Sequence, residues 1–250
     1  MGAHSIANAI REAINSGKYP HGSRLPTVRE LMARHDVSQQ TVASAYNMLA
    51  DQGLVKTSGS AGTTVIAAPP GTAHLGTYAP ADLSVADPWT STLGGEEKEE
   101  TVLVRQFLSG AHEASWGIPE GTIVVERIRK RTIDGIPAQH KLTLLPYDTA
   151  LKVPEGYTGV PPMLAPVGAP APDKPAGVRM ADWLGWDIAH TQVTISDKPM
   201  RDDACEMLGM PEGTPGRIIT NVSKDSSGAV LYVTVTTAPV HHDITMTITG

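Results

Sequence analysis

Residues 23–66 constrain the fold more than any other stretch, because they combine two capped helices with a hairpin. Thr27 and Glu30 have the spacing of a capping box at the start of a first helix. After a short turn, Ser38 is placed to cap a second helix by accepting from the amide of Thr41. The second helix carries one apolar stripe at helical spacing: Val42, Ala45, Tyr46 and Leu49.

This second helix is expected to end at Gly53, because glycine adopts the left-handed conformation that often follows a helix. Two short strands, 54–56 and 63–66, then flank a turn rich in Gly and Ser. Helix, turn, helix and hairpin together predict a winged helix-turn-helix, whose second helix enters the major groove of DNA.

The charge of the chain is unevenly distributed. The net charge of the 250 residues is −6, which by itself argues against a nucleic-acid partner. Residues 1–66, however, hold six Lys and Arg against four acidic residues, whereas the rest hold fourteen against twenty-two. A mildly basic head on an acidic body is the asymmetry expected when only the head binds nucleic acid.

Composition limits the other classes of protein. Apolar residues make up 40% and charged residues 18% of the chain, which is typical of a globular protein. We expect no membrane span and no secretion signal, since no apolar run is long enough. The single cysteine, Cys205, cannot form an internal disulfide, which fits a reducing cytoplasm.

Residues 5–66 as a whole resemble the DNA-binding head of the GntR family of bacterial transcription regulators. A helix at 5–16 would pack on the motif described above. The positions that carry the resemblance are Ile10, Arg11, Ile14, Gly17, Gly22–Thr27, Arg29–Leu31, Val37, Ser38, Thr41, Val42, Leu49, Gly53–Val55, Gly62, Thr63 and Val65.

The resemblance implies a set of DNA contacts. These are Arg29 on the first motif helix, a phosphate contact from Arg24, and the residues Ser38, Gln39, Gln40, Thr41, Ala61 and Gly62 of the recognition helix and wing tip. Helix N-termini offer free amides to phosphate, and glutamine amides can pair with adenine. Two alternatives stay open: the arginines are solvated surface residues, and Ser38 is a helix cap.

The recognition helix departs from the family at two positions. Gln39 and Ala43 stand where members often carry arginine. We therefore expect less guanine readout and fewer charge contacts from this helix.

Residues 68–100 show no persistent periodicity and read as a linker between a head at 1–67 and a body at 101–250. A structureless loop of this length is improbable inside one compact domain. The acidic run at 96–100 is expected to be a solvated face.

The body contains an internal repeat. The segment 116–122, with Pro-Glu-Gly-Thr at its end, recurs at 208–214 after a shift of 92 residues. Each copy follows a short helical stretch and precedes a hairpin, the first turning at Asp134 and Gly135. Two units, 101–146 and 193–248, would pair into one antiparallel sheet with helices on a face, an α+β fold. Between them, the Pro- and Gly-rich residues 147–177 are expected to cover a surface or cross between the halves, and 178–186 to be helical.

The repeat makes the resemblance more specific. A GntR head followed by such a body resembles the HutC subfamily, whose effector-binding UTRA domain has a chorismate-lyase-like fold. The match lies at Ile118–Thr122, Glu126–Arg129, Gly135–Pro137, Pro211–Thr214 and Tyr232, and the segment 147–177 departs from the usual pattern.

Arginines on one predicted strand are the candidate effector site. Arg127, Arg129 and Arg131 alternate and so project from one face. Arg127 and Arg129 could hold a carboxylate or phosphate by bidentate hydrogen bonds, and the resemblance implies the same positions. His140 and Tyr232 are further candidates. The alternatives are a solvent-facing arginine row with Glu partners, and ordinary packing of His140 and Tyr232.

No cofactor and no metal are expected. Neighbouring residues of the run 241–243, His-His-Asp, would point to opposite faces of a strand, and no third ligand has suitable spacing. Cys205 is expected to be a small buried apolar residue. The sequence contains no phosphate-binding loop and no nucleophile elbow.

We therefore expect a non-enzymatic transcription regulator, a repressor that binds a palindromic operator as a homodimer and responds to an anionic small molecule. One alternative is a chorismate-lyase-like enzyme fused to a DNA-binding head, for which no positioned acid or base is evident. A second alternative is a repressor without a ligand.

Overall fold

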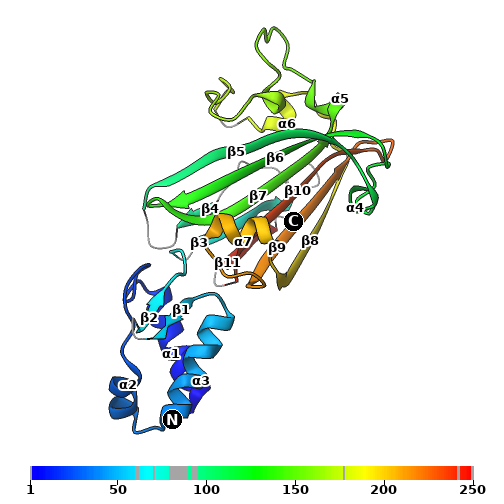
Figure 1. The fold of residues 1–250 in the computed structure, drawn as a ribbon. Helices are drawn as coiled ribbons and strands as arrows, with labels where there is room; N and C mark the ends of the chain where they lie inside the picture. The colour runs from blue at the N-terminus through cyan, green and yellow to red at the C-terminus, as the bar shows by residue number, and fades with distance from the viewer. Residues whose placement is uncertain are drawn as a thin grey trace.

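The computed structural model describes residues 2–59, 62–69, 71–78, 89–91, 95–176, 178–240 and 243–248, with backbone alone at 71–78, 89–91 and 243–248. A small head and a larger body built on a sheet follow one another along the chain (Figure 1). The head contains α1 (Ala3–Asn15), α2 (Val28–His35), α3 (Gln39–Asp51), β1 (Val55–Ser58) and β2 (Gly62–Val65).

Local signals in the head form as the sequence predicts. Thr27 accepts from the amide of Glu30, whose side chain accepts from the amide of Thr27, so the capping box is complete. Ser38 caps α3 by accepting from the amide of Thr41 at 3.2 Å. Gly53 follows the helix with a φ of 67°, a conformation that costs glycine little.

The core of the head joins all three helices to the hairpin. Ile6, Ile10 and Ile14 of α1 pack against the apolar stripe of α3, Leu31 and Val65. The segment 22–25 adds an extended piece beside β2, through bonds from Leu25 to the Thr63 carbonyl and from Gly22 to the Val65 carbonyl, both 2.9 Å. This third strand-like segment of the wing had not been expected from the sequence.

The body is an antiparallel sheet made of the two repeated units. Within the described residues it has six strands in the order β5-β6-β7-β10-β9-β8. Its strands are β5 (Glu97–Leu108), β6 (Ile123–Ile133), β7 (Ile136–Pro146), β8 (His190–Pro199), β9 (Pro215–Lys224) and β10 (Val230–Pro239). The short helices α4 (Ala111–Ala114) and α7 (Asp202–Leu208) occupy equivalent places in the two units. The predicted repeat and the pairing of its two halves into one sheet are confirmed, except that residues 243–248 of the second unit pair in another sheet.

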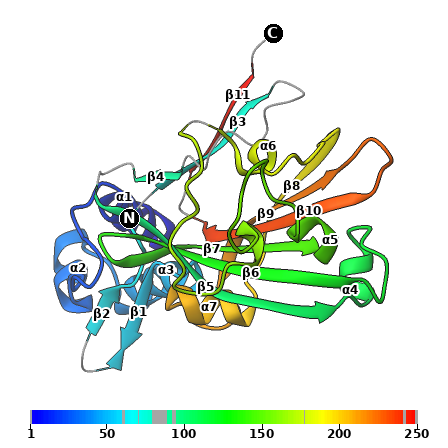
Figure 2. The ribbon, with the colours of Figure 1, turned by 90° about the horizontal axis from the view of Figure 1, so that it is seen from above.

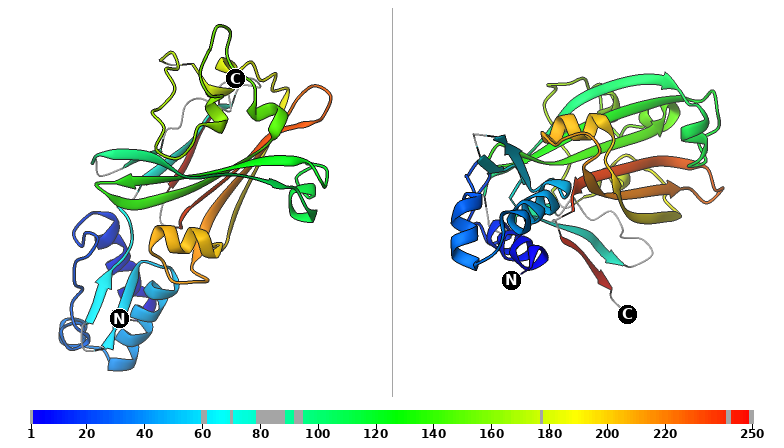
Figure 3. Two further views of the ribbon diagram at one scale, coloured as in Figure 1. Left: turned by 45° about the horizontal axis from the view of Figure 1, so that its top comes forward. Right: turned by 60° about the horizontal axis from the view of Figure 1, so that its bottom comes forward.

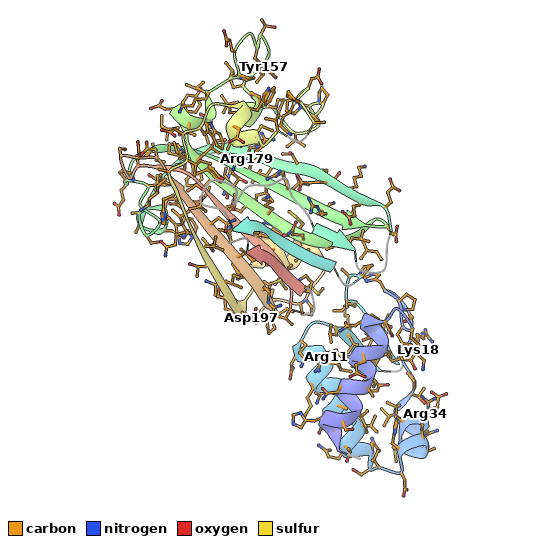
Figure 4. All side chains as sticks on the ribbon, turned by 180° about the vertical axis from the view of Figure 1, so that it is seen from behind. Arg11, Lys18, Arg34, Tyr157, Arg179 and Asp197 are labelled. Carbon is orange, nitrogen blue, oxygen red and sulfur yellow. The ribbon has the colours of Figure 1, made fainter. Side chains whose placement is uncertain are left out.

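The two faces of this sheet differ in character. The apolar face carries Ile128, Leu142, Leu144, Val233 and Val235 and packs against residues next to or within α4 and α7. The opposite face, which we call the cationic face, carries Arg127, Arg129 and Arg131. Above it lie α5 (Tyr147–Ala150), a 3-10 turn at Pro162–Leu164 and α6 (Met180–Trp183) (Figures 1 and 4).

The segment between the repeats is therefore a cover for the cationic face. Its helix α6 is shorter than the helix expected at 178–186. Tyr157 packs edge-on against Trp183 with ring centroids 5.7 Å apart, which ties the loop to α6.

The expected linker is partly structured. Strands β3 (Gly71–Tyr78), β4 (Trp89–Ser91) and β11 (Asp243–Ile248) form a separate sheet in which β11 pairs in parallel with β3 (Figure 2). Strand β5 also begins at Glu97, inside the acidic run, because Glu99 and Glu100 form ion pairs with basic residues of the neighbouring strand β6. Local patterning did not reveal β3, since its partner lies far away in the sequence.

Candidate nucleic-acid interface and cationic sheet face

The N-terminus of α3 is the first candidate site. Gln39 and Gln40 are exposed in its first turn, and Ser38 and Thr41 share a hydroxyl contact of 2.9 Å beside them. Tyr46 in the middle of α3 donates to the Pro26 carbonyl just before α2, which fixes the two helices relative to each other. The start of α3 is thus presented by a rigid pair of helices.

Two arginines and the wing tip are the other predicted DNA contacts in the head. Arg29 is exposed on the first turns of α2. Arg24 has an exposed side chain, while its backbone bridges to Thr64 of β2. Gly62 opens β2 with a φ of 83°, and Ala61 lies outside the described residues.

The opposite end of α3 meets the body. A Cβ atom on Gly53 would lie 2.5 Å from Cγ2 of Thr214 and 3.5 Å from Sδ of Met210. Ile66 packs against the cluster formed by Met200, Ala204, Cys205, Leu208 and Met210. Cys205 is buried here, as the sequence predicts, and α7 stands between the head and the sheet (Figure 3).

A row of polar side chains crosses the cationic face. Backbone register aligns Arg127, Thr143, Thr234 and Asn221 on four neighbouring strands. Oγ1 of Thr143 and Oδ1 of Asn221 are buried and have no hydrogen-bond partner in the described structure. Buried polar atoms in proteins are normally satisfied, so this row is suited to a polar ligand.

Arg127 lies at one end of the row. Its guanidinium donates to the carbonyls of Met163 at 3.0 Å and Ala165 at 2.9 Å, and to Oγ1 of Thr101 at 3.2 Å. These acceptors are all neutral. Burial, with a smaller contribution from Arg129, lowers the pKa of Arg127 to about 10, so the group still carries its charge at neutral pH.

The other two arginines share one carboxylate. NH1 of Arg129 donates to Oε1 of Glu99 at 2.7 Å, and NH2 of Arg131 donates to Oε2 of the same residue at 3.0 Å. The expected alternative of Glu partners thus holds for Arg129 and Arg131 but not for Arg127.

Tyr232 lies on the cationic face with its ring tilted against Trp186, the centroids 5.2 Å apart. Burial raises the pKa of Tyr232, and the Nε1 atom of Trp186 is buried without a partner in the described structure. An aromatic wall thus stands beside the polar row. Sequence reasoning missed Trp186, Thr143, Thr234 and Asn221; the alternation of Thr and Lys with Leu in β7 was the available signal for Thr143.

The grouping of His140 with the arginines needs correction. Ile133 pairs with Ile136 and Thr132 with Pro137, but Arg131 pairs with Gln139, so the register shifts by one residue at this point. Without the shift Arg129 would face His140; with it, Arg129 pairs with Lys141 and His140 turns to the other face. His140 is fully buried there against α7, with Nε2 3.9 Å from Oδ2 of Asp203.

The surroundings of His140 keep it neutral. Burial lowers its pKa below 6.5, an effect that Arg201 reinforces and that Asp203 and Glu126 oppose. Neither ring nitrogen has a hydrogen-bond partner in the described residues.

Two further sequence expectations concern metals and membranes. The described side chains contain no group of three or more His, Cys, Asp or Glu residues that could hold a metal ion. The pair 241–242 lies outside the described residues. No helix in the described part of the chain combines the length and the apolar character of a membrane span.

Comparison with known proteins decides between a transcription regulator and an enzyme fused to a DNA-binding head. Residues 3–65 match the model of the gntR family of bacterial regulatory proteins. An HTH-type transcriptional regulator of Streptomyces coelicolor, SCO4628, is 30% identical over 217 residues, which cover 83% of this chain and 77% of the relative. The chain belongs to the GntR family. The HTH-type regulator Rv0792c of Mycobacterium tuberculosis is 28% identical over 245 residues, covering 92% of this chain and 79% of the relative.

Membership of the GntR family gives the head its role. The head is a DNA-binding winged helix-turn-helix, and α3 is the second helix of that motif. Both relatives are transcriptional regulators, not enzymes, which decides against the enzyme alternative. A solved structure of a GntR-family regulator, 18% identical, shares the fold over 99% of this chain and 96% of its own, with a TM-score of 0.51.

Proposed function

We propose that this GntR-family regulator is a one-component repressor of the HutC type, acting in the cytoplasm, where bacterial chromosomal DNA lies. Its head would bind a palindromic operator, and its UTRA-like body would bind an anionic small molecule. The observation that carries the proposal is the exposed start of α3, whose Gln39 and Gln40 stand on a helix that Tyr46 ties to the segment before α2.

The head is expected to act as a homodimer, because its recognition helix is short. One recognition helix reads only a few base pairs, and helix-turn-helix proteins gain specificity by placing two such helices in successive major grooves. The glutamine amides can pair with adenine, and Arg29 and Arg24 supply contacts to base edges or phosphate.

The polar row on the cationic face supports an anionic effector. Among the described residues, Arg127 has neutral acceptors only, and Thr143 and Asn221, whose side-chain oxygens have no partner there, lie in line with it. Tyr232 and Trp186 supply an aromatic wall next to the row. We therefore propose a carboxylate or phosphate compound with an apolar or ring portion, its anionic group bound by Arg127 and Arg129.

Such a ligand can act on DNA binding only if it prefers one placement of the heads. The contact of Gly53 and Ile66 with the residues around α7 is the route by which the body would set that placement.

The DNA-binding part is tested by a gel-shift screen of genomic fragments against excess non-specific DNA at modest salt. We expect a small set of fragments to be retained by a dimer. Binding of all fragments with equal affinity, or of none, would reject the proposal.

A ligand-independent repressor is the second candidate, because Glu99 and two backbone carbonyls already occupy the arginines. Thermal-shift measurements against a panel of carboxylate and phosphate metabolites separate the two. Stabilisation of the wild type that is absent from Arg127→Ala supports an effector; no stabilisation by any compound supports the second candidate.

A further inference from the structure

The carboxylate of Glu99 lies on the cationic face. Glu99 of β5 is paired with Arg131 of the neighbouring strand β6, and its two oxygens accept separately from Arg131 and Arg129. The side chain of Glu99 is 25% exposed and that of Arg129 is 30% exposed, whereas Arg131 is 8% exposed. One internal carboxylate thus joins an accessible arginine to a buried one.

Its neighbour Glu100 makes a similar bond on the other face of the same strand pair. Glu100 pairs with Lys130 at 2.8 Å, and the two side chains are 44% and 27% exposed. The first part of β5 is therefore held to β6 by ion pairs on both faces: Glu99 with Arg129 and Arg131 on one, and Glu100 with Lys130 on the other. Strand β5 has only β6 as a neighbour in the sheet, so these contacts matter more than they would in a central strand.

We propose that Glu99 is an internal competitor of the effector: an anion bound by Arg129 displaces the Glu99 carboxylate and loosens the start of β5. The inference rests on the proposed anionic effector. A second negative charge beside Glu99 would repel its carboxylate. Glu99 is 25% exposed, so its side chain can turn toward solvent while the bound anion replaces its negative charge beside the arginines.

The consequence falls at the start of the six-stranded sheet. Residues 97–101 are the first of β5, and just before them the amide of Glu96 donates to Oδ1 of Asp134 at 2.7 Å. When the Glu99 bonds are lost, the start of β5 keeps its backbone pairing with β6, the contact of Glu96 with Asp134 and the ion pair of Glu100 with Lys130.

The test uses the full-length protein with inorganic phosphate as the probe. Calorimetric titration compares the wild type with Glu99→Gln, the matched control Glu100→Gln, and Arg127→Ala. We expect Glu99→Gln to bind phosphate about tenfold more tightly than the wild type, a factor that corresponds to 1.4 kcal/mol. Glu100→Gln is expected to bind like the wild type.

Hydrogen exchange of backbone amides shows directly whether bound phosphate loosens the start of β5. Saturating phosphate should speed amide exchange at 97–101 in the wild type and leave Glu99→Gln unchanged.

Equal phosphate affinities for wild type, Glu99→Gln and Glu100→Gln, with binding lost in Arg127→Ala, would overturn the competitor role and leave the effector site standing. Absence of phosphate binding in every variant, including Glu99→Gln, would overturn the competitor role and the anionic effector together. The DNA-binding role is judged separately by the gel-shift screen.

Discussion

Replacing Gly53 by alanine tests whether the head rests on the body as the structure shows. Two effects are expected to lower the free energy of unfolding. The φ of 67° is a left-handed conformation, which costs a residue with a Cβ about 1–2 kcal/mol. The new Cβ would also lie 2.5 Å from Cγ2 of Thr214, a buried residue whose hydroxyl donates to the Pro211 carbonyl at 2.6 Å. Turning Thr214 aside breaks that bond, a further loss of about 1 kcal/mol.

A double-mutant cycle separates the two costs. Thr214→Ser keeps the hydroxyl and removes the obstructing methyl group, so the second cost should vanish in Gly53→Ala/Thr214→Ser. Gly209→Ala is a matched control for the first cost, because Gly209 has a φ of 65° and nothing within 4 Å of its added Cβ. Urea unfolding measures all free energies, and we expect a coupling energy of about 1 kcal/mol. Effects that add within about 0.5 kcal/mol would mean that Gly53 and Thr214 are not in contact in solution.

Three other substitutions address the functional sites and His140. Arg29→Ala should weaken operator binding by about 1–3 kcal/mol if Arg29 touches a base. The control is Arg11→Ala, because the Arg11 side chain bonds to Gln52 and Asn8 within the head, and it should leave the gel shift unchanged. Equal effects of the two substitutions would reject the role of Arg29. The double variant Arg127→Ala/Arg129→Ala should keep operator binding and lose the response to the effector, and loss of DNA binding as well would show that the pair is structural. Burial lowers the pKa of His140 below 6.5, so the unfolded chain binds more protons than the folded one, and the free energy of unfolding should fall as the pH drops below about 6.5. His140→Gln should flatten this pH dependence, measured by urea unfolding at several pH values. An unchanged slope in the variant would contradict the expectation.

The head was predictable because its signals are local. A capping box, a serine cap and an apolar stripe each lie within a few residues, and all form in the structure. The hairpin of the body was predictable for the same reason: Asp134 and Gly135 adopt φ values of 51° and 78°, as a tight two-residue turn with positive φ requires. The internal repeat then supplied the pairing of the two halves.

The candidate site was harder to predict, because it depends on register. One extra residue between Pro137 and Gln139 decides which side chains of β7 face the arginines. Pro137, a residue type found at bulges within sheets, lies beside the shift, but its presence does not fix the register that follows. Strand β3 was also hard to predict, because its partner β11 lies far away in the sequence. The alignment of Arg127 with Asn221 likewise emerges only once four strands are in register.

A footprint on a retained genomic fragment tests the central claim most directly. A dimer that reads DNA with α3 should protect two symmetric half-sites whose centres lie about one helical turn, ~34 Å, or a multiple of it apart. Gln39→Ala/Gln40→Ala should lose this protection. Uniform protection without half-sites, or an unchanged footprint in the double variant, would contradict the assignment of α3 as the element that reads the operator.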